Sequence, residues 1–255
     1  MQDRPLQTKI IYGPVTSRRL GRSLGVNLLP TEQKVCSFDC LYCQYGFTEV
    51  YKVRRDAEGL RLPIPMEVAE ALMDALPAAG PLDSITLAGN GEPTLHPHFR
   101  QIAEVVVRQR DMHKKGVPVS ILSNSSTAEQ MDVRLALARI DRRIMKLDSG
   151  TQATFEKINR PPPGTLLKRI VESLVQLKAV EIQALFIEGA LSNSTPAEIE
   201  AWCGHLAQIK PVAVQVYTFD RQPADNTIRQ VGRERLEQIA ASARQAAPGA
   251  DVKVY

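Results

Sequence analysis

The stretch VCSFDCLYCQYG, residues 35–46, places three of the chain's four cysteines within eight positions. Cys36, Cys40 and Cys43 have the spacing C-x3-C-x2-C, and Cys203 stands far from them. Disulfide-stapled folds are short secreted chains, whereas 255 residues can bury a large core without staples. We therefore expect the three cysteines to form a site and not a disulfide framework.

Around this stretch, apolar runs rich in β-branched residues alternate with amphipathic segments, a pattern typical of β-α units around a parallel sheet. The predicted strands are residues 24–28, 84–87, 117–122, 144–147, 182–187 and 212–217, with DVKVY at 251–255 as a last short strand. The predicted helices begin near Pro65, Pro97, Thr127, Thr165, Thr195 and Gly232. Thr127 and Gln130 would form a capping box.

Six β-α units are fewer than the eight that close a full barrel. We therefore expect an α/β fold with a mostly parallel sheet, either a partial (β/α)6 barrel or a doubly wound sheet. No repeat or linker interrupts the pattern, which predicts a single domain over residues 1–255. Residues 1–22 would be a basic N-terminal segment leading into the first strand.

The composition, 44% hydrophobic and 24% charged, is that of an ordinary globular protein and excludes disorder. No apolar run approaches the ~20 residues that span a bilayer, and MQDRPLQTKI lacks the apolar part of a signal peptide. We expect a cytoplasmic protein with no membrane partner. The net charge of +4 is compatible with nucleic acid, with anionic cofactors or with neither.

Three thiolates so close in sequence can hold one metal centre, either zinc or an iron-sulfur cluster. A cubane cluster has four irons, so three local cysteines would leave one iron without a protein ligand. The alternative is a structural zinc site completed by a histidine or by Cys203. Cys203 is better explained as a core residue, on one helix face with Ile199, Leu206 and Ile209. His96 and His98 could also bind metal, but a solvated loop is the simpler interpretation.

These residues resemble those of the radical S-adenosylmethionine (SAM) superfamily. CSFDCLYC looks like the C-x3-C-x-aromatic-C signature of that superfamily, and NGEP at residues 90–93 looks like its GGEP motif, with Asn90 in place of the first glycine. GPVTSRRLGRSLGVNLLP, KLDSG, FEKINRP and VQVYTFDRQPAD are similar to the branch of Fe-S oxidoreductases related to the wyosine-tRNA synthesis enzymes.

The resemblance implies a radical SAM enzyme, in which a [4Fe-4S] cluster cleaves SAM to a 5′-deoxyadenosyl radical that abstracts hydrogen from a substrate. Cys36, Cys40 and Cys43 would be the cluster ligands, with no catalytic residue beyond the residues that bind the cofactors. The implied SAM-binding residues are Tyr42, Asn90, Gly91, Glu92, Ser123, Asn124, Asp148 and Tyr217. Glu92 would pair with the SAM amino group or brace its turn, and Asn124 and Asp148 could instead be turn or helix-capping residues.

The substrate is left open. Archaeal wyosine synthases hold a second cluster on cysteines that precede this motif, and this chain has none before Cys36. Three arginines in SRRLGRS, residues 17–23, could receive the phosphates of an RNA or of a phosphorylated substrate. The expected partners are SAM, a one-electron donor of the flavodoxin or ferredoxin type, and that substrate. The competing hypotheses are a non-catalytic metal-binding module that recognises RNA or protein, and an electron-transfer Fe-S protein.

Overall fold

A computed structural model describes residues 5–52 and 55–255, and these residues divide into two units. The first unit consists of residues 6–37 and 49–144, and the second consists of residues 5, 38–48 and 145–255. The single domain over residues 1–255 stays a prediction. Residues 1–4 of the predicted basic segment lie outside the described residues.

The main strands of the first unit lie in the order β1-β2-β5-β6. β1 (Ile11–Ser17) pairs antiparallel with β2 (Gly21–Val26), and β5 (Ser84–Leu87) lies parallel to both β2 and β6 (Val119–Ser123). β5 has the predicted bounds, and β2 and β6 are displaced by a few residues from theirs. β1 was not predicted, because Gly-Pro at 13–14 interrupts its alternation of apolar residues.

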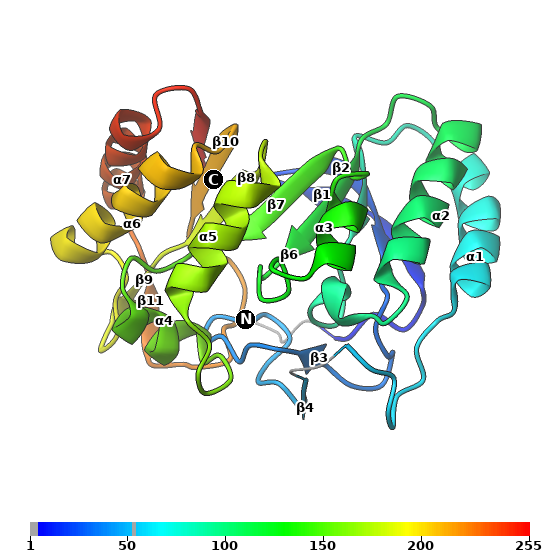
Figure 1. Ribbon diagram of the computed structural model, residues 1–255, viewed down its shortest axis with the longest axis horizontal. Coiled ribbons are helices and arrows are strands. Elements are labelled where there is room, and N and C mark those ends of the chain that lie inside the picture. The colour runs from blue at the N-terminus through cyan, green and yellow to red at the C-terminus, as the bar shows by residue number, and fades with distance from the viewer. Residues whose placement is uncertain (1–4, 53–54) are drawn as a thin grey trace. The chain divides into compact units, whose positions relative to one another are not determined.

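The helices of the first unit are α1 (Pro65–Ala78), α2 (Phe99–His113) and α3 (Met131–Leu137). α1 and α2 pack side by side (Figure 1), and α2 also contacts α3. α3 begins four residues after the predicted Thr127, and the predicted capping box is wrong. Gln130 makes no side-chain cap, and the Thr127 hydroxyl donates to Thr94 Oγ1 at 2.5 Å.

Polar side chains inside the first unit's sheet form hydrogen bonds with one another. The hydroxyls of Ser23 and Thr86 are 2.7 Å apart, and those of Ser84 and Ser120 are 2.8 Å apart. These residues are at most 3% exposed. Buried hydroxyls cost stability unless they are hydrogen-bonded, so this ladder lets the strands stay buried on both faces.

The second unit contains parallel strands in the order β8-β10-β12, which are Glu181–Leu185, Ala213–Tyr217 and Asp251–Val254. β7 (Arg142–Lys146) spans the division between the units, and the Leu147 amide that follows it donates to Gln183 O at 3.1 Å. The strands lie close to the predicted ones, and parallel pairing predominates as expected.

The helices of the second unit are α4 (Gln152–Asn159), α5 (Leu167–Leu177), α6 (Pro196–Ile209) and α7 (Arg233–Ala246). Thr195 caps α6 as expected, with its hydroxyl accepting from Glu198 N. Five short elements of the two units were not predicted, in addition to β1 and α4. They are the 3-10 turn η1 (Pro93–Leu95) and the short strand pairs β3 (Val35–Cys36) with β4 (Val50–Tyr51) and β9 (Ile187–Gly189) with β11 (Ile228–Gln230).

The basic sequence SRRLGRS forms the turn of the β1-β2 hairpin and the start of β2, where a loop was expected. The Arg22 side chain donates to two backbone carbonyls, Pro81 O at 2.9 Å and Ala79 O at 3.3 Å. Arg22 therefore ties the hairpin to the end of α1.

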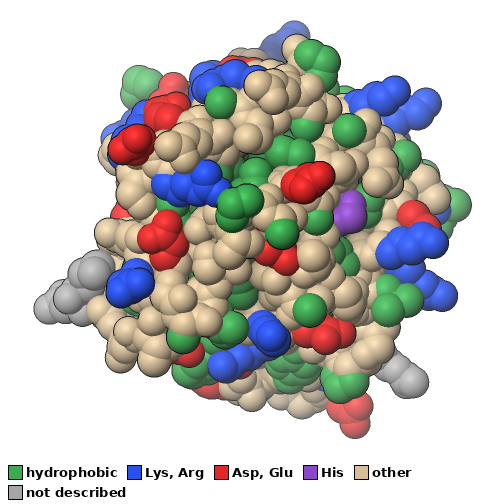
Figure 2. Space-filling view, turned by 90° about the vertical axis from the view of Figure 1, so that its left-hand side faces the viewer, with side chains coloured by type: hydrophobic (Ala, Val, Ile, Leu, Met, Phe, Trp, Pro, Cys, Tyr) green, Lys and Arg blue, Asp and Glu red, His purple; other side chains and the backbone are tan. Residues whose placement is uncertain are grey.

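The surface drawn in Figure 2 carries Lys and Arg side chains interspersed with Asp and Glu. Some of these charges form exposed ion pairs; on α7, for example, Arg233 Nη2 lies 2.7 Å from Glu237 Oε1. Within residues 5–52 and 55–255, no helix combines the length and the apolar character that crossing a bilayer requires.

A buried carboxylate on α6 holds the start of α4. Glu198 accepts from the amides of Gly150 at 3.0 Å and Thr151 at 3.2 Å, and from the hydroxyls of Thr151 at 2.5 Å and Thr154 at 2.7 Å. Residue 150 must be a glycine, because a Cβ there would lie 2.3 Å from the backbone oxygen of Glu198. The position of α4 thus depends on α6.

We predict that Glu198→Ala lowers the free energy of unfolding by about 2–4 kcal/mol, because it leaves two amides and two hydroxyls without their acceptor. Glu200→Ala is the control, since Glu200 is an exposed carboxylate on the same helix. Chemical denaturation measures both. Equal small effects of the two substitutions would contradict the role assigned to Glu198.

Candidate functional site

The NGEP loop is hydrogen-bonded to the residue before the first cysteine. Val35 N donates to Asn90 O at 2.9 Å, and Glu92 N donates to Val35 O at 3.2 Å. Gly91 has φ +138°, and a Cβ there would lie 1.7 Å from Val35 O. Only glycine permits so close an approach of two backbones, so Gly91 fixes the loop against the start of the cysteine stretch.

Asn90, which replaces a glycine of the family motif, is fully buried. Its Oδ1 accepts from Gln7 N at 2.7 Å, and its Nδ2 donates to Gln7 O at 2.9 Å and to Pro30 O at 2.8 Å. The side chain therefore anchors the segment before β1 and the loop after β2, and the NGEP backbone keeps its own hydrogen bonds.

The Glu92 carboxylate is a hub of the first unit. It accepts from Thr94 N at 3.0 Å, Thr94 Oγ1 at 2.6 Å, Ser123 Oγ at 2.9 Å and Asn124 N at 2.5 Å. Burial raises the pKa of Glu92 above its ordinary value, against the opposing effect of these hydrogen bonds. Of the two roles considered for Glu92, the contacts seen here are those of a brace, which joins the end of β5 to the end of β6.

Asn124 links the Glu92 carboxylate to the first cysteine, Cys36. Its Nδ2 donates to Ser37 Oγ at 2.9 Å and lies 3.6 Å from Cys36 Sγ, and its Oδ1 accepts from Ser126 N at 3.0 Å. Two predicted SAM-binding residues, Ser123 and Asn124, are thus joined to Glu92 within one unit.

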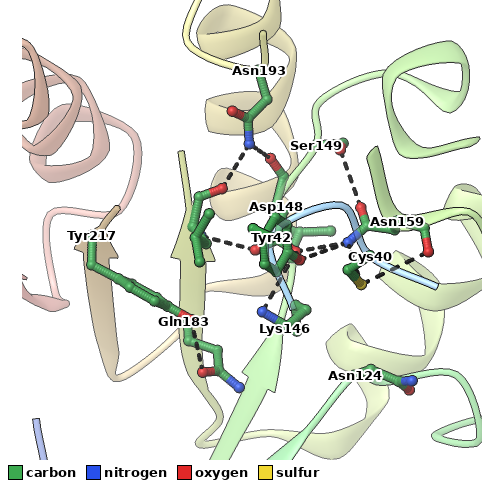
Figure 3. A network of polar contacts seen from close by, with 12 residues as sticks. Cys40, Tyr42, Asn124, Lys146, Asp148, Ser149, Asn159, Gln183, Asn193 and Tyr217 are labelled. Atoms are coloured by element: carbon green, nitrogen blue, oxygen red, sulfur yellow. Dashed lines mark hydrogen bonds and ion pairs between the residues drawn. The ribbon is translucent and has the colours of Figure 1, made fainter. Parts of the chain in front are cut away.

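A second network surrounds Cys40 in the second unit (Figure 3). Asn159 Nδ2 lies 3.4 Å from Cys40 Sγ, 2.8 Å from Tyr42 OH and 2.8 Å from Asp148 Oδ2. Tyr42 OH donates to Asp148 Oδ2, and burial together with this carboxylate raises the pKa of Tyr42 well above its ordinary value. The structure therefore brings together Cys40, Tyr42 and Asp148, all three predicted as site residues.

Asp148 is fixed from several sides. Leu185 N donates to its Oδ1 at 2.8 Å, and Lys146 Nζ lies 3.6 Å from its Oδ2. The Lys146 ammonium also lies 4.9 Å from the centre of the Tyr42 ring. Burial raises the pKa of the Cys40 thiol, and the charge of Lys146 opposes that rise. Lys146 was not predicted as a site residue, because a lysine in a strand has no sequence signal that separates it from a surface residue.

The cysteine loop is held by the end of α4. Asp39 N donates to Asn159 O at 3.0 Å, and Leu41 N donates to Ile158 O at 3.0 Å. α4 stops there because Arg160 takes a left-handed conformation before three prolines. FEKINRPPPG is therefore a helix-ending device that also aims Asn159 at Cys40, a role that its sequence leaves ambiguous.

Tyr217 and Cys203 lie outside the two networks described above. Tyr217, at the end of β10, donates to Gln183 Oε1 at 3.3 Å. Cys203 is only partly buried, and the core position on α6 belongs to Trp202, 1% exposed, whose Nε1 donates to Leu147 O at 2.9 Å. Cys203 was expected in the core with Ile199, Leu206 and Ile209; those three are buried, whereas Cys203 lies at the edge of the buried face of α6.

His96 does not lie in a solvated loop. It is 1% exposed, its Nε2 lies 3.0 Å from Pro63 O, and its Nδ1 accepts from His98 N at 3.0 Å. Because a carbonyl requires a donor and an amide requires an acceptor, the ring is neutral with its proton on Nε2. Both nitrogens are therefore engaged by the backbone, which removes His96 as a metal ligand.

The three cysteines and the amides beside them fit an iron-sulfur cluster in their chemistry. Cys36, Cys40 and Cys43 form no disulfide, and side-chain amide N–H groups approach the sulfurs of Cys36 and Cys40. Thiolates with such donors suit an iron-sulfur centre. In the described part of the chain, no three His, Cys, Asp or Glu side chains are arranged as a metal site. Cys36 belongs to the first unit, and Cys40 and Cys43 belong to the second.

Comparison with known families assigns the class. The profile of the Radical SAM superfamily matches residues 33–201, which include the three cysteines, the NGEP loop and the Asp148 network. The chain belongs to the radical SAM superfamily. The predicted resemblance is confirmed at this level.

Two curated relatives have similar sequences. A UPF0026 protein from Helicobacter pylori is 30% identical over 217 residues, which are 83% of this chain and 67% of that protein. A protein named GTPase Obg from Brachyspira hyodysenteriae is 31% identical over 235 residues, 91% of this chain. This chain spans 33% of that protein's length.

Two solved structures share the fold. A radical SAM methyltransferase from Sphaerobacter thermophilus has a TM-score of 0.59 and 18% identity, over 91% of this chain and 65% of that chain. TYW1 with a lysine-pyruvate adduct bound has a TM-score of 0.59 and 14% identity, over 88% of this chain and 73% of that chain. The predicted α/β fold of the radical SAM core is confirmed, and a wyosine-synthesis enzyme is among its structural neighbours.

We predict that Gly91→Ala lowers the free energy of unfolding by several kcal/mol or prevents folding, because the Cβ meets the Val35 carbonyl and φ is positive. Gly204→Ala is the control, since a Cβ at this position in α6 meets nothing within 4 Å. Replacing glycine by alanine inside a helix stabilises by about 1 kcal/mol. Denaturation midpoints that move alike in both variants would show that Gly91 has no special constraint.

His96 gives a pH prediction. Burial lowers the pKa of His96 from 6.5 to about 4, so the folded protein binds fewer protons than the unfolded chain in this window. The stabilisation is complete above pH 6.5 and is lost as the pH falls towards 4, by at most about 3 kcal/mol. Unfolding at several pH values should show a smaller slope for His96→Gln than for the wild type. His98→Gln, at an exposed histidine, should keep the wild-type slope; identical slopes for all three proteins would contradict this assignment.

Proposed function

We propose that the protein holds one [4Fe-4S] cluster through Cys36, Cys40 and Cys43 and uses it with SAM as a radical SAM enzyme. The observation that carries the proposal lies in the first unit. There the NGEP loop is hydrogen-bonded to Val35, and Asn124 links Glu92 to Cys36. The two motifs that define the family thus meet through direct contacts.

The chain's own residues would bind and orient the cofactors. The proposed SAM-binding residues are Tyr42, Asn90, Gly91, Glu92, Ser123, Asn124, Asp148 and Tyr217. Within this set, Asn90 and Gly91 would act through the backbone, because the Asn90 side chain is taken up by Gln7 and Pro30. Glu92 would hold the end of β5 in the first unit, and Asp148 would hold the end of β7 in the second.

When bound, the reduced cluster supplies the electron that splits SAM into methionine and a 5′-deoxyadenosyl radical, which abstracts hydrogen from the substrate. The protein's contribution is binding, orientation and exclusion of side reactions. The buried surroundings of Cys40, Tyr42 and Asp148 support the exclusion of water from the cluster loop.

We propose a one-electron donor of the flavodoxin or ferredoxin type and a cytoplasmic setting. The substrate class stays open between an RNA base, a phosphorylated metabolite and a protein. The three arginines of the SRRLGRS segment remain our proposed contacts for the phosphates of such a substrate.

Anaerobically purified protein should be brown, contain about four irons and release 5′-deoxyadenosine when dithionite and SAM are added. Iron analysis, absorption spectra and chromatography of the nucleoside measure these properties. A colourless protein with one zinc and intact SAM would replace this proposal with a structural metal site. Iron without SAM cleavage would favour electron transfer.

The cysteine variants sharpen the assignment. Cys36→Ala, Cys40→Ala and Cys43→Ala should each lose the cluster and nucleoside release, whereas Cys203→Ala should keep both. Loss of iron in Cys203→Ala, with retention in any of the other three, would assign the ligands differently.

A further inference from the structure

The side-chain amide of Asn159 is held in one orientation beside Cys40. Its Nδ2 faces the Asp148 carboxylate and Tyr42 OH at 2.8 Å each, and its Oδ1 lies 3.4 Å from the Ser149 hydroxyl (Figure 3). A carboxylate accepts and does not donate, so the nitrogen must face Asp148. One N–H of Asn159 Nδ2 points to Asp148 Oδ2 and Tyr42 OH, which lie next to each other. The second N–H can donate to Cys40 Sγ, which is 3.4 Å from the nitrogen.

Asn124 is oriented in the same way beside Cys36. Its Oδ1 accepts from Ser126 N at 3.0 Å, so its Nδ2 must face the other side. There it meets Ser37 Oγ at 2.9 Å and Cys36 Sγ at 3.6 Å. The residue is 7% exposed, and its backbone amide is bound to Glu92 Oε2 at 2.5 Å, which leaves the side chain little freedom to turn away.

Each unit therefore aims one buried asparagine amide at the sulfur of one proposed ligand. We propose that Asn124 and Asn159 donate N–H···S hydrogen bonds to Cys36 and Cys40 in the cluster-loaded protein and thereby raise the cluster's reduction potential. This inference rests on the proposed function. Both are positioning residues, because they act through the cysteine sulfurs.

The direction follows from charge. One-electron reduction adds negative charge to the cluster and its thiolate sulfurs, and a hydrogen bond to a sulfur stabilises the more negative state. Both donors are fixed before reduction, Asn124 by Glu92 and Ser126 and Asn159 by Asp148 and Tyr42, so little reorganisation accompanies the electron.

The experiment compares the reconstituted wild type with Asn124→Leu, Asn159→Leu and the double variant. Leucine keeps the approximate shape and removes the N–H groups. Redox titration followed by electron paramagnetic resonance should give more negative midpoint potentials for each single variant and the most negative for the double variant. Electron-nuclear double resonance on samples in H2O and in D2O identifies the exchangeable protons coupled to the cluster, and each single variant should lose one of them.

Asn193→Ala is the matched control. Asn193 is a buried asparagine of the same network whose Nδ2 donates to the backbone oxygens of Asp148 at 2.7 Å and Leu185 at 2.8 Å and contacts no sulfur. Its potential and its coupled protons should equal those of the wild type. If a leucine is not accommodated, alanine at the same position gives the same measurement.

The outcomes separate two failures. A wild type that takes up no cluster overturns the proposed function. A loaded wild type with potentials and proton couplings unchanged in the asparagine variants leaves that function standing and overturns this inference. A shift of equal size in Asn193→Ala would make the effect a general loosening and would also overturn it.

Discussion

The buried carboxylate of Glu92 is the interaction on which the first unit's site depends. Four donors from the NGEP turn and from the end of β6 converge on it, among them the backbone amide of Asn124. Because a buried carboxylate is stable only when its oxygens are hydrogen-bonded, the ends of β5 and β6 must stay together for this unit to fold. Through Asn124, the same constraint fixes an amide beside Cys36.

In the second unit, the predicted site residues are arranged around another buried carboxylate, that of Asp148. Leu185, Asn159, Tyr42 and Lys146 approach the carboxylate, so the end of β7, the end of β8 and the cysteine loop are fixed to one group. Glu198 sets the start of α4, and the carbonyls at the end of α4 receive the amides of the cysteine loop. The loop's conformation thus depends on a helix about 120 residues further along the chain.

Sequence reasoning predicted the elements with clear periodicity. β5 and α1 follow from an apolar run and from a proline-started amphipathic pattern, and the cysteine spacing with NGEP identified the family. It missed β1, where Gly-Pro breaks the alternation, and α4, which has only eight residues. It also misjudged His96, because the burial of this ring and its contact with Pro63 O depend on tertiary packing. For Asn159, the sequence left open whether FEKINRPPPG is a rigid loop aimed at the site or a helix-ending device, because the partners of Asn159 come from residues 40, 42 and 148.

The central claim is that the three cysteines hold a cluster whose remaining iron binds SAM. It is tested most directly by electron-nuclear double resonance on the reduced protein with SAM labelled with 15N at its amino group. The account predicts a 15N coupling that disappears when unlabelled SAM replaces the labelled compound. A reduced cluster whose spectrum is the same with and without SAM would contradict it.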